Sequence, residues 1–204
     1  MCGRYTISSP LDILKDEFHI INSINFPASY NAAPSQALPV VIGNEIRLME
    51  WGFLPDWAQD KDIGPQINAR SETVHEKPFF KDAFINNRCL IPANGFYEWT
   101  KIKGGKQPWY ITTHHIMAFA GIYNESGFCI LTKEAVGSVA QIHSRMPVIV
   151  SKTQYQNWMN GKTAEALSII EQAIIPDFDI FTVSTRVNTP ANNDETLIER
   201  DQLF

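Results

Sequence analysis

Short runs of apolar residues, bounded by Gly, Pro or Asn, recur along most of the chain and predict β-strands. The clearest turn signal between two such runs is Gly43-Asn44, which predicts a hairpin within residues 38–53. A run at 88–99 contains Gly95, which predicts a bulge in that strand. The other predicted strands are 3–8, 109–113, 116–123, 128–132, 146–150 and 179–184.

Helical spacing is confined to a few segments. Ser9 is a candidate N-cap, Pro10 fits the first helical position, and the next apolar residues share one helical face. These face residues are Leu11, Leu14 and Phe18. Further helices are predicted at 79–87, 152–160 and 163–173, whereas 55–70 carries Pro, Gly and Asp without periodicity and predicts an irregular loop.

Together these elements predict a strand-rich α+β protein. Hairpin-like connections dominate, which favours a mostly antiparallel sheet with peripheral helices. The length of 204 residues and the 44% hydrophobic content are typical of one globular domain, so we expect a single domain over 1–204.

Charge, hydropathy and cysteine content limit the binding partners and the cellular compartment that we expect. The net charge of −5 gives no sign of a nucleic-acid partner at the level of the whole molecule, although a local basic groove remains compatible with it. The longest apolar runs fall short of the roughly 20 residues of a membrane span, and no signal-peptide pattern opens the chain, so we expect a cytoplasmic protein without a membrane partner.

The three cysteines lack CxxC spacing and are expected to be free, with Cys89 and Cys129 as buried small hydrophobes.

Cys2 is the first candidate for chemistry. Its side chain is small enough for a methionine aminopeptidase to remove Met1, which would leave an α-amine and a thiol on one residue. Such a residue carries two nucleophiles, the amine and the thiol, that can both react with one electrophilic carbon.

Other polar residues stand among apolar neighbours, and each has a purely structural interpretation. Glu98 in "FYEW" fits a strand residue facing water, but the alternation is not clean, and we favour a buried, functional carboxylate. His143 fits a histidine at a helix end, and Asn68 fits a turn residue. Arg4, Arg70 and Arg145 fit surface ion pairs.

The order of motifs changes this assessment. The chain carries "MCGRY", "YNAAPSQ", "WGFLPDW", "INARSET", "RCLIPANGFYEW", "IHSRMPVIV" and "VSTRVN" between Cys2 and Asn188, and this series closely resembles the SOS-response-associated peptidase (SRAP) family. The resemblance implies a single SRAP domain with a curved, mostly antiparallel β structure. It also implies a protein of the DNA damage response that binds single-stranded DNA at abasic sites and links itself covalently to them.

The implied chemistry joins Cys2 to a sugar aldehyde. The aldehyde of a ring-opened abasic site forms an imine with the α-amine, and the thiol closes a thiazolidine ring. Ordinary pKa values of about 7.7 to 8.0 for an α-amine and about 8.5 for a thiol leave some of each nucleophile near neutral pH, and we expect local positive charge to raise the thiolate fraction. No metal or organic cofactor is required.

The resemblance and the side-chain chemistry assign roles to the matching residues. Glu98 is expected to act as general acid and base with a raised pKa, and His143 to protonate the sugar oxygen as the ring opens. Asn68 is expected to hold the sugar hydroxyl or the α-amine. The resemblance also implies removal of Met1, either autocatalytic or by an aminopeptidase, and allows strand cleavage by β-elimination.

The DNA is expected to be single-stranded or at a junction, so that the lesion reaches the N-terminus. Arg4 and Arg70 would clamp flanking phosphates, and Trp51 with Pro34 would stack or wedge against a base. Arg145 and Arg186 are further candidate phosphate contacts, although structural roles explain them equally well. The Asn-rich stretch "RVNTPANND" offers little positive charge, so weak, salt-sensitive affinity is expected.

Three alternatives remain open from the sequence. A hydrolase would use Cys2 as an N-terminal nucleophile, with its own α-amine or His143 as base. A glutaminase also begins Met-Cys-Gly, but the similarity stops there. A non-catalytic binding module would retain Met1. We expect a monomer that associates with the nucleoid when bound to DNA.

Overall fold

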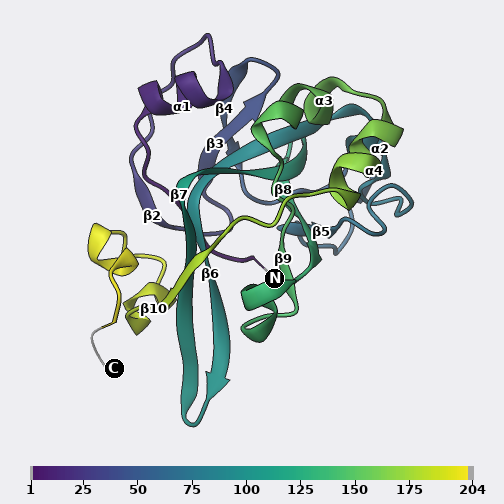
Figure 1. Ribbon diagram of the computed structural model, residues 1–204. Helices are drawn as coiled ribbons and strands as arrows, with labels where there is room; N and C mark the ends of the chain where they lie inside the picture. Colours follow the sequence, from purple (N-terminus) through teal and green to yellow (C-terminus); the bar gives the residue numbers. More distant parts are fainter. Residues whose placement is uncertain (1, 202–204) are drawn as a thin grey trace.

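The computed structural model describes residues 2–201, except for the side chain of His114, and these residues form one sheet of ten strands (Figure 1). Its main path runs β2-β1-β6-β7-β8-β5, with four further strands joined to it. All strand pairs are antiparallel except β5 with β8, so the predicted strand-rich α+β fold is confirmed. The strands are β1 (Tyr5–Ile7), β2 (Ser29–Ala32), β3 (Ala37–Ile42), β4 (Glu45–Glu50), β5 (Asn68–Arg70), β6 (Arg88–Ile102), β7 (Gly105–Asn124), β8 (Gly127–Glu134), β9 (Arg145–Pro147) and β10 (Asp179–Thr182).

The long hairpin of β6 and β7 is the central feature of the sheet, and its tip projects beyond the rest of the molecule (Figure 1). The register shifts between Ala93 and Gly95, as the bulge prediction required. A Cβ atom at Gly95 would lie 2.3 Å from the ring of Tyr110, so only glycine fits this close approach. The strands predicted at 109–113 and 116–123 are one continuous strand, β7.

Helices cover the end of the molecule away from the hairpin tip (Figure 1). The first helix packs on the core through Leu14 and Phe18, which are both buried. Its N-cap is Pro10, not Ser9 as we predicted. Ser9 instead accepts a hydrogen bond of 2.8 Å from the Asn94 amide. The α-helices are α1 (Leu11–Phe18), α2 (Lys81–Asn86), α3 (Tyr155–Asn160) and α4 (Thr163–Glu171). Short 3-10 helices are η1 (Asp56–Ala58), η2 (Gly137–Gln141), η3 (Lys152–Gln154), η4 (Thr185–Asn188) and η5 (Glu195–Ile198).

Arg88, the first residue of β6, joins the sheet to the helices. It is 4% exposed, and its guanidinium donates only to backbone carbonyls. The acceptors are Phe84, Ile85, Trp158 and Gly161. Because these carbonyls lie at the ends of α2 and α3, one buried cation fixes both helices to the sheet.

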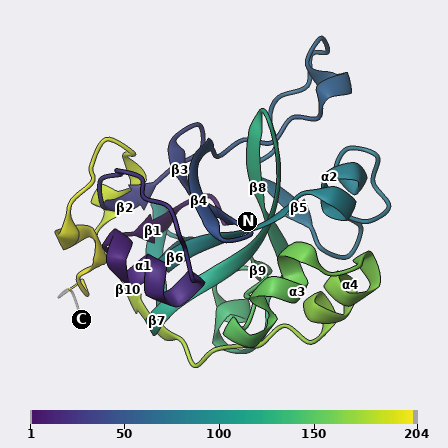
Figure 2. The ribbon, with the colours of Figure 1, turned by 90° about the horizontal axis from the view of Figure 1, so that it is seen from above.

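The irregular loop predicted over 55–70 is only partly present, because Asp56–Ala58 forms η1 and Asn68–Arg70 forms β5. The segment from 59 to 66 is irregular and forms part of an arm that stands away from the body when the molecule is seen from above (Figure 2). The hairpin predicted around Gly43 is present as β3 and β4, with Gly43 at φ 60°. The free cysteines Cys89 and Cys129 are fully buried, as expected.

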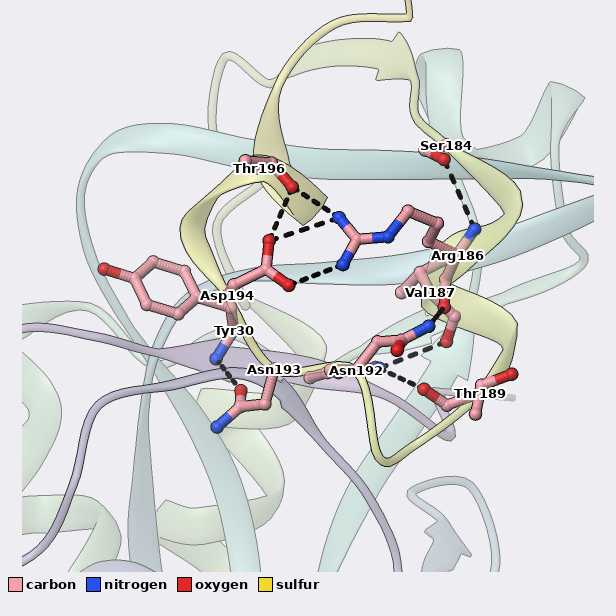
Figure 3. A network of polar contacts seen from close by, with 10 residues as sticks. Tyr30, Ser184, Arg186, Val187, Thr189, Asn192, Asn193, Asp194 and Thr196 are labelled. Atoms are coloured by element: carbon pink, nitrogen blue, oxygen red, sulfur yellow. Dashed lines mark hydrogen bonds and ion pairs between the residues drawn. The ribbon is translucent and has the colours of Figure 1, made fainter.

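The Asn-rich C-terminal segment, residues 185–198, packs against β2 through side-chain amides (Figure 3). The buried Asn31 amide donates to the carbonyls of Val187, Thr189 and Asn192. Asn193 accepts from the Tyr30 backbone N–H at 2.7 Å. The asparagines therefore serve as structural links, which explains a composition that offers little charge to DNA.

Within the described residues, no helix has the length and apolar character needed to cross a membrane.

Candidate functional site

Four segments that are distant in sequence converge near the N-terminus. Cys2 precedes β1, Asn68 lies in β5, Glu98 in β6, and His143 follows η2. Pairing of β1 with β6 aligns Tyr5 with Phe96, and the Tyr97 N–H donates to the Arg4 carbonyl at 3.0 Å. This register brings the residues before β1 beside Glu98.

Cys2 is completely buried. Its carbonyl accepts a hydrogen bond of 2.9 Å from the Asn68 side-chain amide, which ties the N-terminal backbone to β5. Burial, and then the charge of Glu98, raises the pKa of the Cys2 thiol well above its ordinary value. We expected local positive charge to raise the thiolate fraction, but desolvation and the neighbouring carboxylate, which both favour the protonated thiol, outweigh the effect of positive charge on this pKa.

Glu98 is 3% exposed, so the interpretation as a water-facing strand residue is excluded. Its Oε1 lies 3.8 Å from His143 Nδ1. Burial raises the pKa of Glu98, and the charge of His143 opposes part of this rise. The Arg145 N–H donates to His143 Nδ1 at 3.0 Å, which fixes the orientation of the imidazole ring.

A cavity of about 580 Å³ opens beside these groups. Its lining combines a carboxylate, an imidazole, two cations, an amide and an indole. The residues are Arg4, Glu98, Trp99, Lys106, His143 and Asn188. Cys2 and Asn68 do not line this cavity themselves: the Cys2 thiol donates to the carbonyl of Arg4 at 3.9 Å, and Asn68 donates to the Cys2 carbonyl.

Two polar atoms at this site are buried without a hydrogen-bond partner among the described residues: Nε of Arg4 and Oδ1 of Asn68. Arg4 uses Nη1 to donate to Asn31 Oδ1 at 2.7 Å and to the Val187 carbonyl at 2.9 Å. Burial lowers the pKa of Arg4 from its ordinary value. Because buried polar atoms are normally paired, these two are suited to meet a bound group.

We predicted that Trp51 would stack against a DNA base at the surface, but it lies in the core. It is 0% exposed, its indole N–H donates to the Ile67 carbonyl at 2.9 Å, and its ring stacks on Phe128. A base has no access to this ring, so the expected stacking is wrong and Trp51 is a core residue. Pro34 lies in the turn between β2 and β3 and is half-buried.

The predicted arginines differ in their surroundings. Arg70 is exposed and lies two positions after Asn68 in β5, on the same side of that strand. Arg145 forms a bidentate ion pair with Glu72 at 2.6 and 2.8 Å, which occupies the guanidinium that was expected to bind phosphate. Arg186 is likewise paired with Asp194 at 2.7 Å (Figure 3).

Three cavity residues were missed from the sequence: Trp99, Lys106 and Asn188. The Trp99 N–H donates to Asn188 Oδ1 at 2.8 Å. The signal for Trp99 was present, because it directly follows Glu98 in "FYEW". Lys106 could not be identified from the sequence, because its position at the cavity depends on the pairing of β6 with β7.

No group of three or more His, Cys, Asp or Glu residues suited to hold a metal ion occurs in residues 2–201.

The fold and site define a strand-rich α+β protein in which a buried cysteine and a buried carboxylate lie near a half-buried amide and a half-buried histidine. The family model described as SOS response associated peptidase (SRAP) matches residues 1–190, and the chain belongs to this family.

Relatives support the same assignment, and a solved structure shares the fold. The chain is 36% identical to the abasic site processing protein YoqW of Bacillus subtilis, over 98% of this chain and 99% of the relative. It is 26% identical to the abasic site processing protein HMCES of Xenopus tropicalis, over 84% of this chain and 66% of the relative. The crystal structure of a protein from Bacteroides thetaiotaomicron shares the fold with a TM-score of 0.82 at 22% identity, covering 98% of this chain and all of the other.

Proposed function

We propose that this protein processes abasic sites in single-stranded DNA by forming a covalent thiazolidine link through Cys2, and thereby shields the lesion during the DNA damage response. The observation that carries the proposal is the juxtaposition of Cys2, the buried Glu98 and His143 beside a cavity. Family membership and the names of its relatives support the choice of substrate. The protein would act in the cytoplasm, on the nucleoid.

The reaction begins after Met1, which lies outside the described residues, has been removed. The α-amine of Cys2 then attacks the aldehyde carbon of the open sugar, and loss of one water gives an imine. His143, near Glu98 and on the cavity wall, is placed to protonate the sugar oxygen as the ring opens. The free Oδ1 of Asn68 is suited to accept a hydrogen bond from the α-amine, while its amide holds the Cys2 carbonyl.

Ring closure depends on Glu98. Because burial keeps the Cys2 thiol protonated, sulfur can attack the imine carbon only as its proton leaves. Glu98 is the neighbouring carboxylate, and its raised pKa suits it to accept that proton and pass it to the ring nitrogen. The products are one thiazolidine and the water already released, so no redox step or cofactor is needed.

DNA would enter along the cavity. Among residues 2–201, Arg4 keeps a buried Nε without a partner and the exposed Arg70 forms no ion pair, so these two remain the proposed clamp. Trp99 replaces Trp51 as the proposed stacking surface, because its ring lines the cavity. Pro34 keeps its proposed role as a wedge beside the DNA.

Two subsidiary activities belong to the proposal. Removal of Met1 requires cleavage of one peptide bond, either by the protein itself or by an aminopeptidase. An imine that forms without ring closure would permit β-elimination and strand cleavage, which is a lyase reaction.

The test is denaturing gel electrophoresis of protein, shown by intact mass to lack Met1, with a single-stranded oligonucleotide carrying one abasic site. We expect a heat-stable shifted band with the abasic strand and none with an intact strand. The adduct mass should equal protein plus DNA minus one water.

Cys2→Ala should abolish the stable adduct, and Cys129→Ala is the matched control because both cysteines are free and fully buried. Equal adduct yields from the two variants would contradict the thiazolidine mechanism. Absence of any band with the wild-type protein would favour a hydrolase that uses Cys2 on amide substrates. Retention of Met1 in the purified protein would favour a non-catalytic binding module.

A further inference from the structure

The tip of the β6–β7 hairpin is a compact basic surface on an acidic protein. Residues 101–106, "KIKGGK", contain three lysines, whereas the whole chain has a net charge of −5. No Asp or Glu occurs between Trp99 and Asn124. All six tip residues are exposed, and Ile102 is 54% exposed. We call residues 101–106 the hairpin tip.

The lysines of the hairpin tip are not neutralised within the protein. In the part of the chain that the structure describes, Lys101, Lys103 and Lys106 form no ion pair. Lys101 lies directly opposite Lys106 in the antiparallel register. Like charges at opposed positions destabilise a strand pair, so this arrangement calls for an external anion.

The hairpin tip is continuous with the proposed active site. Lys106 lines the cavity together with Glu98 and Trp99. Trp99, Lys101 and their partners share one face of the hairpin, since residues two apart on a strand point to the same side. Ile102 lies four positions after Glu98, so the tip lies about 13 Å further along the strand.

We propose that the hairpin tip binds the phosphates of the DNA strand on one side of the lesion, with Trp99 between the tip and the reacting sugar. This inference rests on the proposed function and specifies the path of its substrate. Single-strand binding combines a positively charged track with an aromatic platform, and the hairpin supplies both in line with the cavity. Because the hairpin projects in one direction, it contacts only one flank of the lesion.

The test compares the triple variant K101A/K103A/K106A with the control K15A/K77A/K81A, which removes the same charge from the helical end of the molecule (Figure 1). The DNA probes carry a reduced abasic site that lacks the aldehyde, with nucleotides on the 5′ side only, on the 3′ side only, or on both. Binding is measured by fluorescence anisotropy over a range of salt concentrations.

We expect the hairpin variant to lower the slope of log K against log salt by about 2, since each phosphate contact to a single strand contributes about 0.7. The loss should occur with the two-sided probe and with only one of the one-sided probes. The control should bind all three probes as the wild type does. Thermal unfolding should show equal stability for both variants, because all six lysines lie at the surface or near it.

Equal slopes for the hairpin and control variants would overturn the inference, and so would equal losses on both flanks. The proposed function is judged separately by crosslinking of the wild-type protein to the aldehyde-bearing strand. Crosslinking with no hairpin effect therefore rejects only the path along the hairpin. Failure of the wild type to crosslink or to bind rejects the proposed function.

Discussion

Arg88, which is buried, and Arg4, which is half-buried, have very different hydrogen-bond partners. Arg88 directs all its bonds to four backbone carbonyls at the ends of α2 and α3. Arg4 donates through Nη1 alone, while its Nε is buried without a partner among residues 2–201. Arg88 is therefore a cation that stabilises the fold, whereas Arg4 lines a cavity and keeps one donor unpaired among the described residues.

The same distinction applies to the neutral polar groups near each arginine. Around Arg88, Trp158 donates to the Cys89 carbonyl at 2.8 Å, so the buried indole is paired. Near Arg4, Asn68 retains an unused Oδ1. Unpaired buried atoms cost stability, so their concentration beside Cys2 indicates a surface built for a bound molecule.

Among the substitutions that test this comparison, Arg88→Met is expected to have the largest effect. Methionine fills much of the same volume but leaves several buried carbonyls without donors, so we expect a loss of about 3–5 kcal/mol in the free energy of unfolding. Urea unfolding measures this loss. Crosslinking by the folded fraction should be unchanged, and a slower crosslinking rate at full folding would show that the two regions are coupled.

Glu98→Gln should act on chemistry rather than on stability. Loss of the proton acceptor should slow crosslinking about 100-fold, as measured in single-turnover time courses. DNA affinity should stay within about twofold, since a neutral amide retains the shape. An equal loss of affinity would assign Glu98 to DNA binding.

Glu98 also gives a pH dependence with a definite sign. Its pKa is raised above the ordinary value of 4.5, so the folded protein holds this proton more tightly than the unfolded chain. The resulting stabilisation is complete below the unfolded pKa and is lost as pH rises through the folded pKa. Wild-type stability should therefore fall relative to Glu98→Gln as pH increases above about 4.5, and a constant difference would contradict the raised pKa.

Trp51→Phe and Trp99→Ala form a third test. The Trp51 change leaves a cavity and an unpaired Ile67 carbonyl, so we expect about 2 kcal/mol lower stability with unchanged DNA affinity. The Trp99 change should weaken DNA binding by about 1–3 kcal/mol and alter stability little. Thermal unfolding and anisotropy distinguish the two patterns, and the reverse pattern would restore Trp51 as the stacking residue.

Glu72→Gln is expected to have the smallest effect. It releases Arg145 from a partly exposed ion pair worth less than about 1 kcal/mol. Arg145 lowers the pKa of Glu72, so this stabilisation is present above the unfolded pKa and is lost as pH falls. DNA affinity should rise slightly at low salt, and no rise would show that Arg145 is purely structural.

The sequence predicted the elements of the fold well because apolar runs, turn residues and the Gly95 bulge are local signals. It also brought Cys2, Asn68, Glu98 and His143 together through the order of their motifs. The prediction that Trp51 stacks on a base was wrong because the sequence around a tryptophan does not show whether its indole faces a core or a groove. The sequence missed Lys106, and misjudged the Cys2 thiol, because strand register and desolvation arise only in the folded chain.

The hydrogen bonds that Arg4 donates to Asn31 and to the Val187 carbonyl connect the candidate site to the C-terminal segment of the chain. The family match ends at residue 190, whereas Asn192, whose carbonyl accepts from the Asn31 amide, and Asn193, which accepts from the Tyr30 N–H, lie beyond it. Substitutions in this tail can therefore adjust an N-terminal arginine without altering any motif. The C-terminal segment is thus a remote place from which the position of a residue at the candidate site can be adjusted.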